Sequence, residues 1–295
     1  MHYYDTQTYI QASEKLDEAC DWLKSIGVDY SRTRVGRYKS ILSCLAKHQD
    51  AGTLDDFFIE YSFEEWVNAT HEVAELERIY EGLGSNRDQS LSRRLSDAIK
   101  GHELYILDSD DRSGRDFGFE LAIAAKFSRA GFPVDFGHDA DIKVNIEGAD
   151  FFVECKRLKS EKKINKRIKE GLKQLHKRYV KSVQPISSRG MLAISIGKIL
   201  NSELGLLEGE DSNEVGLKAF SHNRKFIENY GGLWQGTKDK RTLGVVVVQD
   251  SPAMLTQNDQ LVTCHEVTAN NCIPKAHPEY YDFLGLINYV FPKRT

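Results

Sequence analysis

The sequence contains no long apolar run. Its longest stretches of consecutive apolar residues, 121–125 and 245–248, are far shorter than the roughly 18 residues that a membrane-spanning helix needs. It also lacks the basic start and apolar stretch of a secretory signal, so the protein is expected to stay in the cytoplasm with no membrane partner. With 40% hydrophobic and 28% charged residues and only 6 prolines among 295 residues, the composition predicts a folded chain rather than a fibrous or disordered one.

Cysteine is scarce, and its spacing is uninformative. The five cysteines form an odd number with no C-x-x-C pair, which argues against a disulfide framework and against a zinc ribbon. The one hint of metal ligation is a set whose gaps match no usual zinc spacing, and chance placement explains it as well. That set is Cys264, His265, Cys272 and His277. A glycine-rich phosphate-binding loop is also missing, so any nucleotide-driven step would require a separate partner.

The first part of the chain is predicted to be a helical N-terminal domain over 1–105. Apolar residues there recur every three or four positions, which is the spacing of one helical face. Helices are expected at 9–26, 35–45, 63–83 and 91–99. The polar, turn-rich segment 108–114 then marks a change in periodicity, and the second domain is predicted to span 106–295.

The second domain is predicted to be α/β. Helices are expected at 116–130, 162–183 and 215–230, and strands at 141–146, 150–156, 191–196 and 243–248. The first two strands form a hairpin around a Glu147–Gly148 turn. The last two are continuous apolar runs, which is typical of central strands that are covered on both faces.

Three charged side chains are predicted to converge at one end of this hairpin. Strand alternation puts Glu154 and Lys156 on the same face, and Asp141 begins the partner strand. Two neighbouring carboxylates raise each other's proton affinity unless a cation lies between them, so a hard divalent metal is the natural occupant. Lys156 would hold or activate a water molecule, or stabilise charge that develops on a phosphate.

Glu120 is expected to be buried, because it lies on the apolar stripe of its helix, where a bare carboxylate is costly. Two explanations stay open. One is a buried hydrogen bond or ion pair, with Arg115 or Lys156 as the candidate partner, and the other is a role at the metal site.

The net charge of −4 hides a strong asymmetry. Between Lys156 and Lys181 twelve lysines and arginines accompany two glutamates, so this segment carries +10 and the rest of the chain −14. Such a run is often only a solvated helix face, but beside a phosphate-handling site it would attract and hold a polyanion. The cations expected to meet phosphates are Arg157, Lys159, Lys162, Lys163, Lys166, Arg167 and Lys173.

Together these residues resemble the PD-(D/E)XK superfamily of restriction-endonuclease-like nucleases. The similarity covers residues 115–197. It consists of a Phe-x-x-Glu-Leu helix with Glu120, an aspartate before Ile142, the triplet Glu154-Cys155-Lys156 after an apolar run, and Gln174 on the following helix. The resemblance implies a restriction-endonuclease-like core, with a mixed central sheet flanked by helices. This core follows the helical N-terminal domain along the chain.

The resemblance also implies roles for these residues. Asp141 and Glu154 would ligate Mg²⁺ or Mn²⁺ with help from the Cys155 carbonyl and Glu120. Lys156 would hold or activate the attacking water. Gln174 would be the helical glutamine that some branches of the superfamily carry. Ala140 replaces the proline of the motif, and Arg178 stands where those branches carry a tyrosine. A structural role for Gln174 therefore remains equally open. His138 and Asp139 either face the site or make local hydrogen bonds.

The function implied by the resemblance is a metal-dependent nuclease that hydrolyses phosphodiester bonds, in DNA rather than RNA, with restriction or anti-phage defence suggested by association. The alternative is a non-cleaving nucleic-acid-binding or protein-interaction module on the same fold. A third interpretation makes Glu154 and Lys156 a plain ion pair on a strand surface. The helical N-terminal domain would bind a partner, form a homo-oligomer or gate the substrate.

Overall fold

A computed structural model describes residues 2–4, 9–108, 114–203 and 205–292. The first helices are α1 (Tyr9–Ser25), α2 (Arg34–Ala51), α3 (Leu54–Glu60), α4 (Phe63–Leu83) and α5 (Gln89–Ala98). The later helices are α6 (Gly114–Arg129), α7 (Ile164–Lys181), α8 (Gly197–Leu200), α9 (Ser212–Tyr230), α10 (Gly232–Gln235) and α11 (Tyr280–Val290), with 3-10 turns at Tyr105–Leu107 and Glu161–Lys163. The strands are β1 (His2–Tyr4), β2 (Val134–Asp135), β3 (Ile142–Ile146), β4 (Ala149–Arg157), β5 (Arg189–Ser195), β6 (Leu207–Gly209), β7 (Thr242–Leu255) and β8 (Gln260–Asn271).

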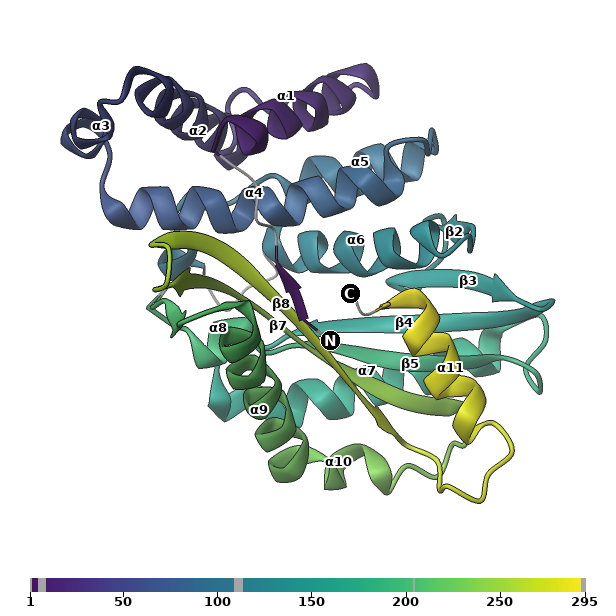
Figure 1. Cartoon of the computed structure of the whole chain (residues 1–295). Helices are drawn as coiled ribbons and strands as arrows, with labels where there is room; N and C mark the ends of the chain where they lie inside the picture. Colours follow the sequence, from purple (N-terminus) through teal and green to yellow (C-terminus); the bar gives the residue numbers. More distant parts are fainter. Residues whose placement is uncertain (1, 5–8, 109–113, 204, 293–295) are drawn as a thin grey trace.

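Within the described residues, the strands form one mixed sheet. Its order is β1-β8-β7-β5-β4-β3-β2, and β6 pairs with β7. Helices α7, α9 and α10 lie on one side of this sheet, and α6 and α11 lie on the other (Figure 1). The α/β class is therefore confirmed, with the sheet as a central layer between helices.

Alternate residues of the central strands pack into two different hydrophobic clusters. Met191, Ala193, Val246 and Val248 join the cluster that contains α4 and α6. Leu192, Ile194, Val245 and Val247 join the cluster beneath α7. Both faces of β5 and β7 are thus buried, as the continuous apolar runs predict.

The hairpin of β3 and β4 positions the predicted site. Its turn contains Glu147 and Gly148, both with positive φ (52° and 84°), which is the backbone of a type I′ turn. The antiparallel register pairs Ile142 with Val153, so Asp141, one residue before the strand, lies opposite Glu154. From β4 the chain crosses through α7 and returns as β5, parallel to β4.

The N-terminal region is helical, as predicted, but it does not have a separate core. Residues of α1, α2, α4 and α5 belong to the same hydrophobic cluster as residues of α6 and the sheet. Helices α4 and α5 lie between α6 and the outer helices α1, α2 and α3 (Figure 1). The predicted turn-rich boundary 108–114 lies largely outside the described residues. No helix in the described part of the chain is long and apolar enough to cross a membrane.

Candidate functional site

Asp141, Glu154 and Lys156 come together at the end of the hairpin. The Lys156 Nζ atom lies 3.6 Å from Asp141 Oδ2 and 3.6 Å from Glu154 Oε2. The same ammonium group donates a hydrogen bond of 2.8 Å to the backbone carbonyl of Cys155. The lysine thus contacts the two carboxylates and the carbonyl that the sequence predicts as metal ligands.

Backbone contacts and close packing hold these side chains in place. The Cys155 amide donates to Asp141 Oδ2 at 2.8 Å, which fixes the aspartate against β4. The stem of Lys156 runs past Gly171 of α7, where an added Cβ would lie 3.3 Å from Lys156 Cγ and 2.5 Å from Leu192 Cδ1. A larger residue at 171 would require the side chain of Leu192 to move and would crowd the lysine stem.

Glu154 is a fully buried acid with a raised pKa. Its side chain has no exposed surface, and burial together with the Asp141 carboxylate raises its pKa to about 7 against the opposing effect of Lys156 and Arg178. Its Oε1 accepts a hydrogen bond from Arg178, whereas its Oε2 is buried without a hydrogen-bond partner. A carboxylate oxygen in that state is suited to a hard divalent cation.

Helix α7 contributes Arg178 to the site. Arg178 Nε donates to Glu154 Oε1 at 2.9 Å, so this arginine is bound directly to the predicted metal ligand. Gln174 lies one turn earlier, on the same helical face, and its Oε1 is buried without a hydrogen-bond partner. The sequence motif that predicts a role for Gln174 does not predict that Arg178 binds Glu154.

The preceding loop is tied to the same helix. Asp139 lies 3.7 Å from Arg178 and 3.8 Å from Lys181, and it remains largely exposed. His138 accepts a local hydrogen bond from the Ala140 amide at 3.3 Å. His138 therefore makes the local hydrogen bond, while Asp139 extends the charged rim of the site.

Glu120 has a partner that the sequence did not indicate. Arg94 of α5 lies 3.3 Å from Glu120 Oε2, and the same guanidinium donates to the backbone carbonyls of Asp141 (2.7 Å) and Ala140 (3.2 Å). Arg115, one of the partners expected for Glu120, instead binds Glu72 at 2.7 Å. Through Arg94, the helical N-terminal region holds the chain segment that carries Asp141.

Two of the cations predicted to meet phosphates are paired with acids in the structure. The side chains of Arg157 and Lys159 have little exposed surface. Arg157 forms an ion pair with Asp108, and Lys159 lies 3.5 Å from Asp108 and 3.2 Å from Asp116. Asp108 and Asp116 thus neutralise both cations at the end of β4.

The other predicted cations lie on or next to α7, and their directions differ. Lys162, Lys163, Lys166 and Lys173 are exposed, and Arg167 is half-buried. At about 100° per residue, Arg167 points roughly the same way as Gln174, and Lys166 and Lys173 are within about 100° of it. Lys169 points roughly 140° away from Gln174. The cations on the site side of the helix could therefore contact a ligand that reaches Glu154.

The weak zinc hint is not supported in the described residues. Cys264 and Cys272 are buried, and His265 binds Asp250 at 2.7 Å. Close groups of metal-ligating side chains in the described part of the chain do not include these residues.

No protein-family model matches the chain, and no curated protein or solved structure matches it.

Burial of Glu154 predicts an unusual dependence of stability on pH. The carboxyl group of a glutamate in the unfolded chain loses its proton near pH 4.5. Glu154 in the folded chain has a pKa of about 7, so it keeps its proton until the pH approaches 7. In EDTA, wild type should therefore lose roughly 3 kcal/mol of unfolding free energy relative to Glu154→Gln as the pH rises from about 4.5 to about 8. Denaturant titrations of both proteins at the two pH values measure this difference. An unchanged difference would show that Glu154 titrates normally.

Proposed function

We propose that the chain is a metal-dependent nuclease that hydrolyses phosphodiester bonds, with DNA as its substrate rather than RNA. The observation that carries the proposal is the convergence of Asp141, Glu154 and the Cys155 carbonyl around one ammonium group, with a buried Glu154 oxygen that lacks a hydrogen-bond partner. Oxygen donors of this kind suit Mg²⁺ or Mn²⁺.

The order of elements supports the same proposal. A helix with Glu120 precedes the hairpin with Asp141 and Glu154, and a helix with Gln174 then leads into a central strand parallel to β4. This is the order that the resemblance to restriction-endonuclease-like nucleases implies. The mixed sheet, with helices on both sides, is compatible with that core.

Each residue of the site has a distinct task in this proposal. Asp141, Glu154 and the Cys155 carbonyl would hold the cation, which, when bound, polarises a phosphoryl oxygen and makes a bound water more acidic. Lys156 would donate hydrogen bonds from its ammonium group to the phosphate or the water. Arg178 fixes the orientation of Glu154 through its 2.9 Å hydrogen bond. Arg94 is a positioning residue, because it acts on Asp141 only through the backbone carbonyl.

A panel of substrates tests the activity. Supercoiled plasmid, linear duplex, single-stranded DNA and RNA of one sequence are incubated with the purified chain in Mg²⁺, Mn²⁺, Ca²⁺ or EDTA. We expect cleavage of DNA in Mg²⁺ or Mn²⁺, and binding without cleavage in Ca²⁺, because a larger and more loosely coordinated ion positions water poorly. Undiminished cleavage in excess EDTA would rule out the proposed chemistry.

One observation favours a non-cleaving nucleic-acid-binding module as the second candidate. The carboxyl groups of Asp141 and Glu154 already have two cationic partners, Lys156 and Arg178. A site neutralised in this way needs no metal to be stable. Binding of DNA by α7 without cleavage of any substrate, in any of the cations, would favour this second function.

The basic face of α7 predicts a steep dependence of DNA binding on salt. The triple substitution of Lys166, Arg167 and Lys173 by glutamine should weaken binding on all sequences alike. It should also flatten the plot of log affinity against log salt by up to about 0.9 for each duplex phosphate that the variant can no longer neutralise. Binding measured at several salt concentrations gives both quantities. Cleavage at saturating substrate should change much less, because these cations do not contact Glu154.

A matched control separates this effect from net charge. Lys218, Arg224 and Lys225 are exposed on α9, so their replacement by glutamine removes the same three charges from a different helix. The control should retain the wild-type slope. Equal slopes in all three proteins would mean that the run on α7 is only a solvated face and that substrate approaches Glu154 by another route.

A further inference from the structure

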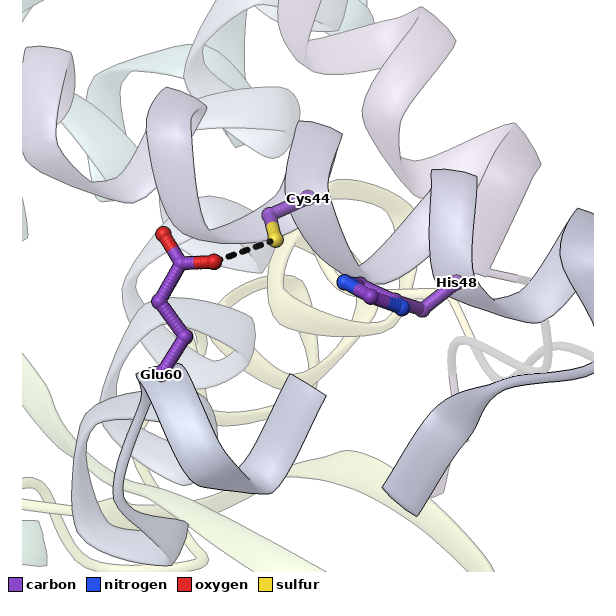
Figure 2. A group of neighbouring side chains, drawn as sticks. All are labelled: Cys44, His48 and Glu60. Atoms are coloured by element: carbon purple, nitrogen blue, oxygen red, sulfur yellow. Dashed lines mark hydrogen bonds between the residues drawn. The ribbon is translucent and has the colours of Figure 1, made fainter. Parts of the chain in front are cut away.

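A second group of metal-ligating side chains lies on the outer helices of the N-terminal region. Cys44 and His48 are one turn apart on α2, and Glu60 is the last residue of α3 (Figure 2). The chain turns back between the two helices at Gly52, whose φ of 69° suits glycine. This reversal brings Glu60 beside Cys44, although the two residues are sixteen positions apart in the sequence.

The cysteine and the glutamate of this group are spaced like two ligands of a tetrahedral metal ion, and the histidine lies close to both. One potential ligand atom from each residue lies within 4.8 Å of the other two, and Cys44 Sγ donates a hydrogen bond of 3.6 Å to Glu60 Oε2. With Zn–S near 2.3 Å and Zn–O near 2.0 Å, a tetrahedral zinc ion would separate its sulfur and oxygen ligands by about 3.5 Å. The cysteine and the glutamate are already at that separation.

His48 is oriented for the same role. Its Nδ1 lies 2.8 Å from the hydroxyl of Thr53, and its ring packs edge-on against the buried Phe57. When one ring nitrogen of a histidine is held by such a hydrogen bond, the other is left to face a metal. Figure 2 shows the imidazole extending toward the sulfur of Cys44.

The donor set also selects the class of metal. A sulfur, an imidazole nitrogen and a carboxylate oxygen suit zinc and similar d-block cations, whereas Mg²⁺ and Ca²⁺ prefer oxygen ligands alone. Three protein ligands leave one position for water. The Asp141–Glu154 site, with oxygen donors only, belongs to the other class.

We propose that Cys44, His48 and Glu60 bind a zinc ion that clips α3 onto α2. Helix α3 has only seven residues, fewer than an isolated helix needs to be stable in water. Helix α3 begins directly after the reversal from α2, and the buried side chain of Phe57 holds its middle against the core. The metal would hold its last residue, Glu60. Coordination replaces the thiol proton of Cys44, which passes to solvent. This proposal is independent of the nuclease function.

Chemical modification of the whole 295-residue chain tests the site, because Cys44 is the one cysteine of the five that is not buried. The protein is stripped with EDTA, given one equivalent of Zn²⁺ or an excess of Mg²⁺, and treated with iodoacetamide. Mass spectrometry then measures alkylation of the peptide that contains Cys44. We expect Zn²⁺ to protect Cys44 and Mg²⁺ to leave it as reactive as in EDTA. Co²⁺ should give a thiolate-to-metal charge-transfer band in wild type and none in Cys44→Ser.

Variants at exposed or half-buried positions keep the test independent of folding. His48→Gln and Glu60→Gln should each weaken zinc binding about tenfold or more, and Thr53→Val should weaken it by a similar factor through the histidine. Asp56→Asn is the matched control, since it makes the same carboxylate-to-amide change on an exposed residue of α3. It should bind zinc like wild type. Alkylation of Cys44 that zinc does not slow, or equal zinc affinity in wild type and His48→Gln, would overturn the proposal.

Discussion

Replacement of Glu154 by glutamine is expected to reduce cation-dependent cleavage by roughly a thousandfold or more. A bound metal contributes several kcal/mol of transition-state stabilisation, and each 1.36 kcal/mol corresponds to a factor of about ten in rate. Glutamine keeps the shape of the side chain but removes the charge that would hold the cation. Asp141→Asn and Lys156→Met should cause losses of the same order, since Lys156 Nζ lies 3.6 Å from both carboxylates. Single-turnover assays at saturating enzyme measure the chemical step.

A nearby carboxylate gives the control for this series. Glu161 is exposed in the turn before α7, so Glu161→Gln makes the same chemical change without touching the site. It should cleave at the wild-type rate. A folded Glu154→Gln protein with wild-type activity would show that the site is assigned to the wrong residues.

Replacement of Arg94 by methionine is expected to lower the unfolding free energy by about 3 kcal/mol. The change removes the ion pair with Glu120 and the hydrogen bonds to the carbonyls of Asp141 and Ala140, and the loss of one partner from a buried polar contact is strongly destabilising. Cleavage should also fall, because the segment that carries Asp141 loses its anchor. Denaturant titration measures the first effect, and single-turnover assays the second.

Two further variants sharpen this prediction. Arg93 is the exposed neighbour of Arg94, so Arg93→Met should change stability by less than about 0.5 kcal/mol. The double variant Arg94→Met, Glu120→Gln should lose less stability than the sum of the two single variants, because the acid no longer has to be neutralised. Purely additive losses would show that Arg94 and Glu120 do not interact energetically.

The part of the site that the sequence predicts depends on local periodicity. Alternation along a strand is enough to place Glu154 and Lys156 on one face, and a two-residue turn then sets the register that brings Asp141 opposite. The helices at 9–26, 63–83 and 215–230 follow from their apolar spacing in the same way. These features depend on residues close together in the chain, so no knowledge of the tertiary packing is needed.

The features that the sequence did not predict depend on contacts between residues far apart in the chain. Arg157 and Lys159 belong to one basic run in the sequence, but they lie at the end of a strand and are buried against Asp108, about fifty residues earlier. Arg94 gives no local sign that it holds Asp141, 47 positions away. Arg178 is visible in the sequence only as a departure from a motif, because the face that α7 turns toward β4 depends on how the crossover packs. Helix α3 escapes prediction because it is short.

The cation requirement of the proposed nuclease is tested most directly by measuring occupancy and rate together. Mn²⁺ binding, followed by electron paramagnetic resonance, and DNA cleavage are recorded in the same samples over a range of Mn²⁺ concentrations, for wild type and for Glu154→Gln. We expect the cleavage rate of wild type to rise in proportion to the occupancy of a Mn²⁺ site, and Glu154→Gln to lose both that site and the activity. Cleavage that does not follow occupancy, or a Glu154→Gln protein that binds Mn²⁺ as wild type does, would contradict the proposed site.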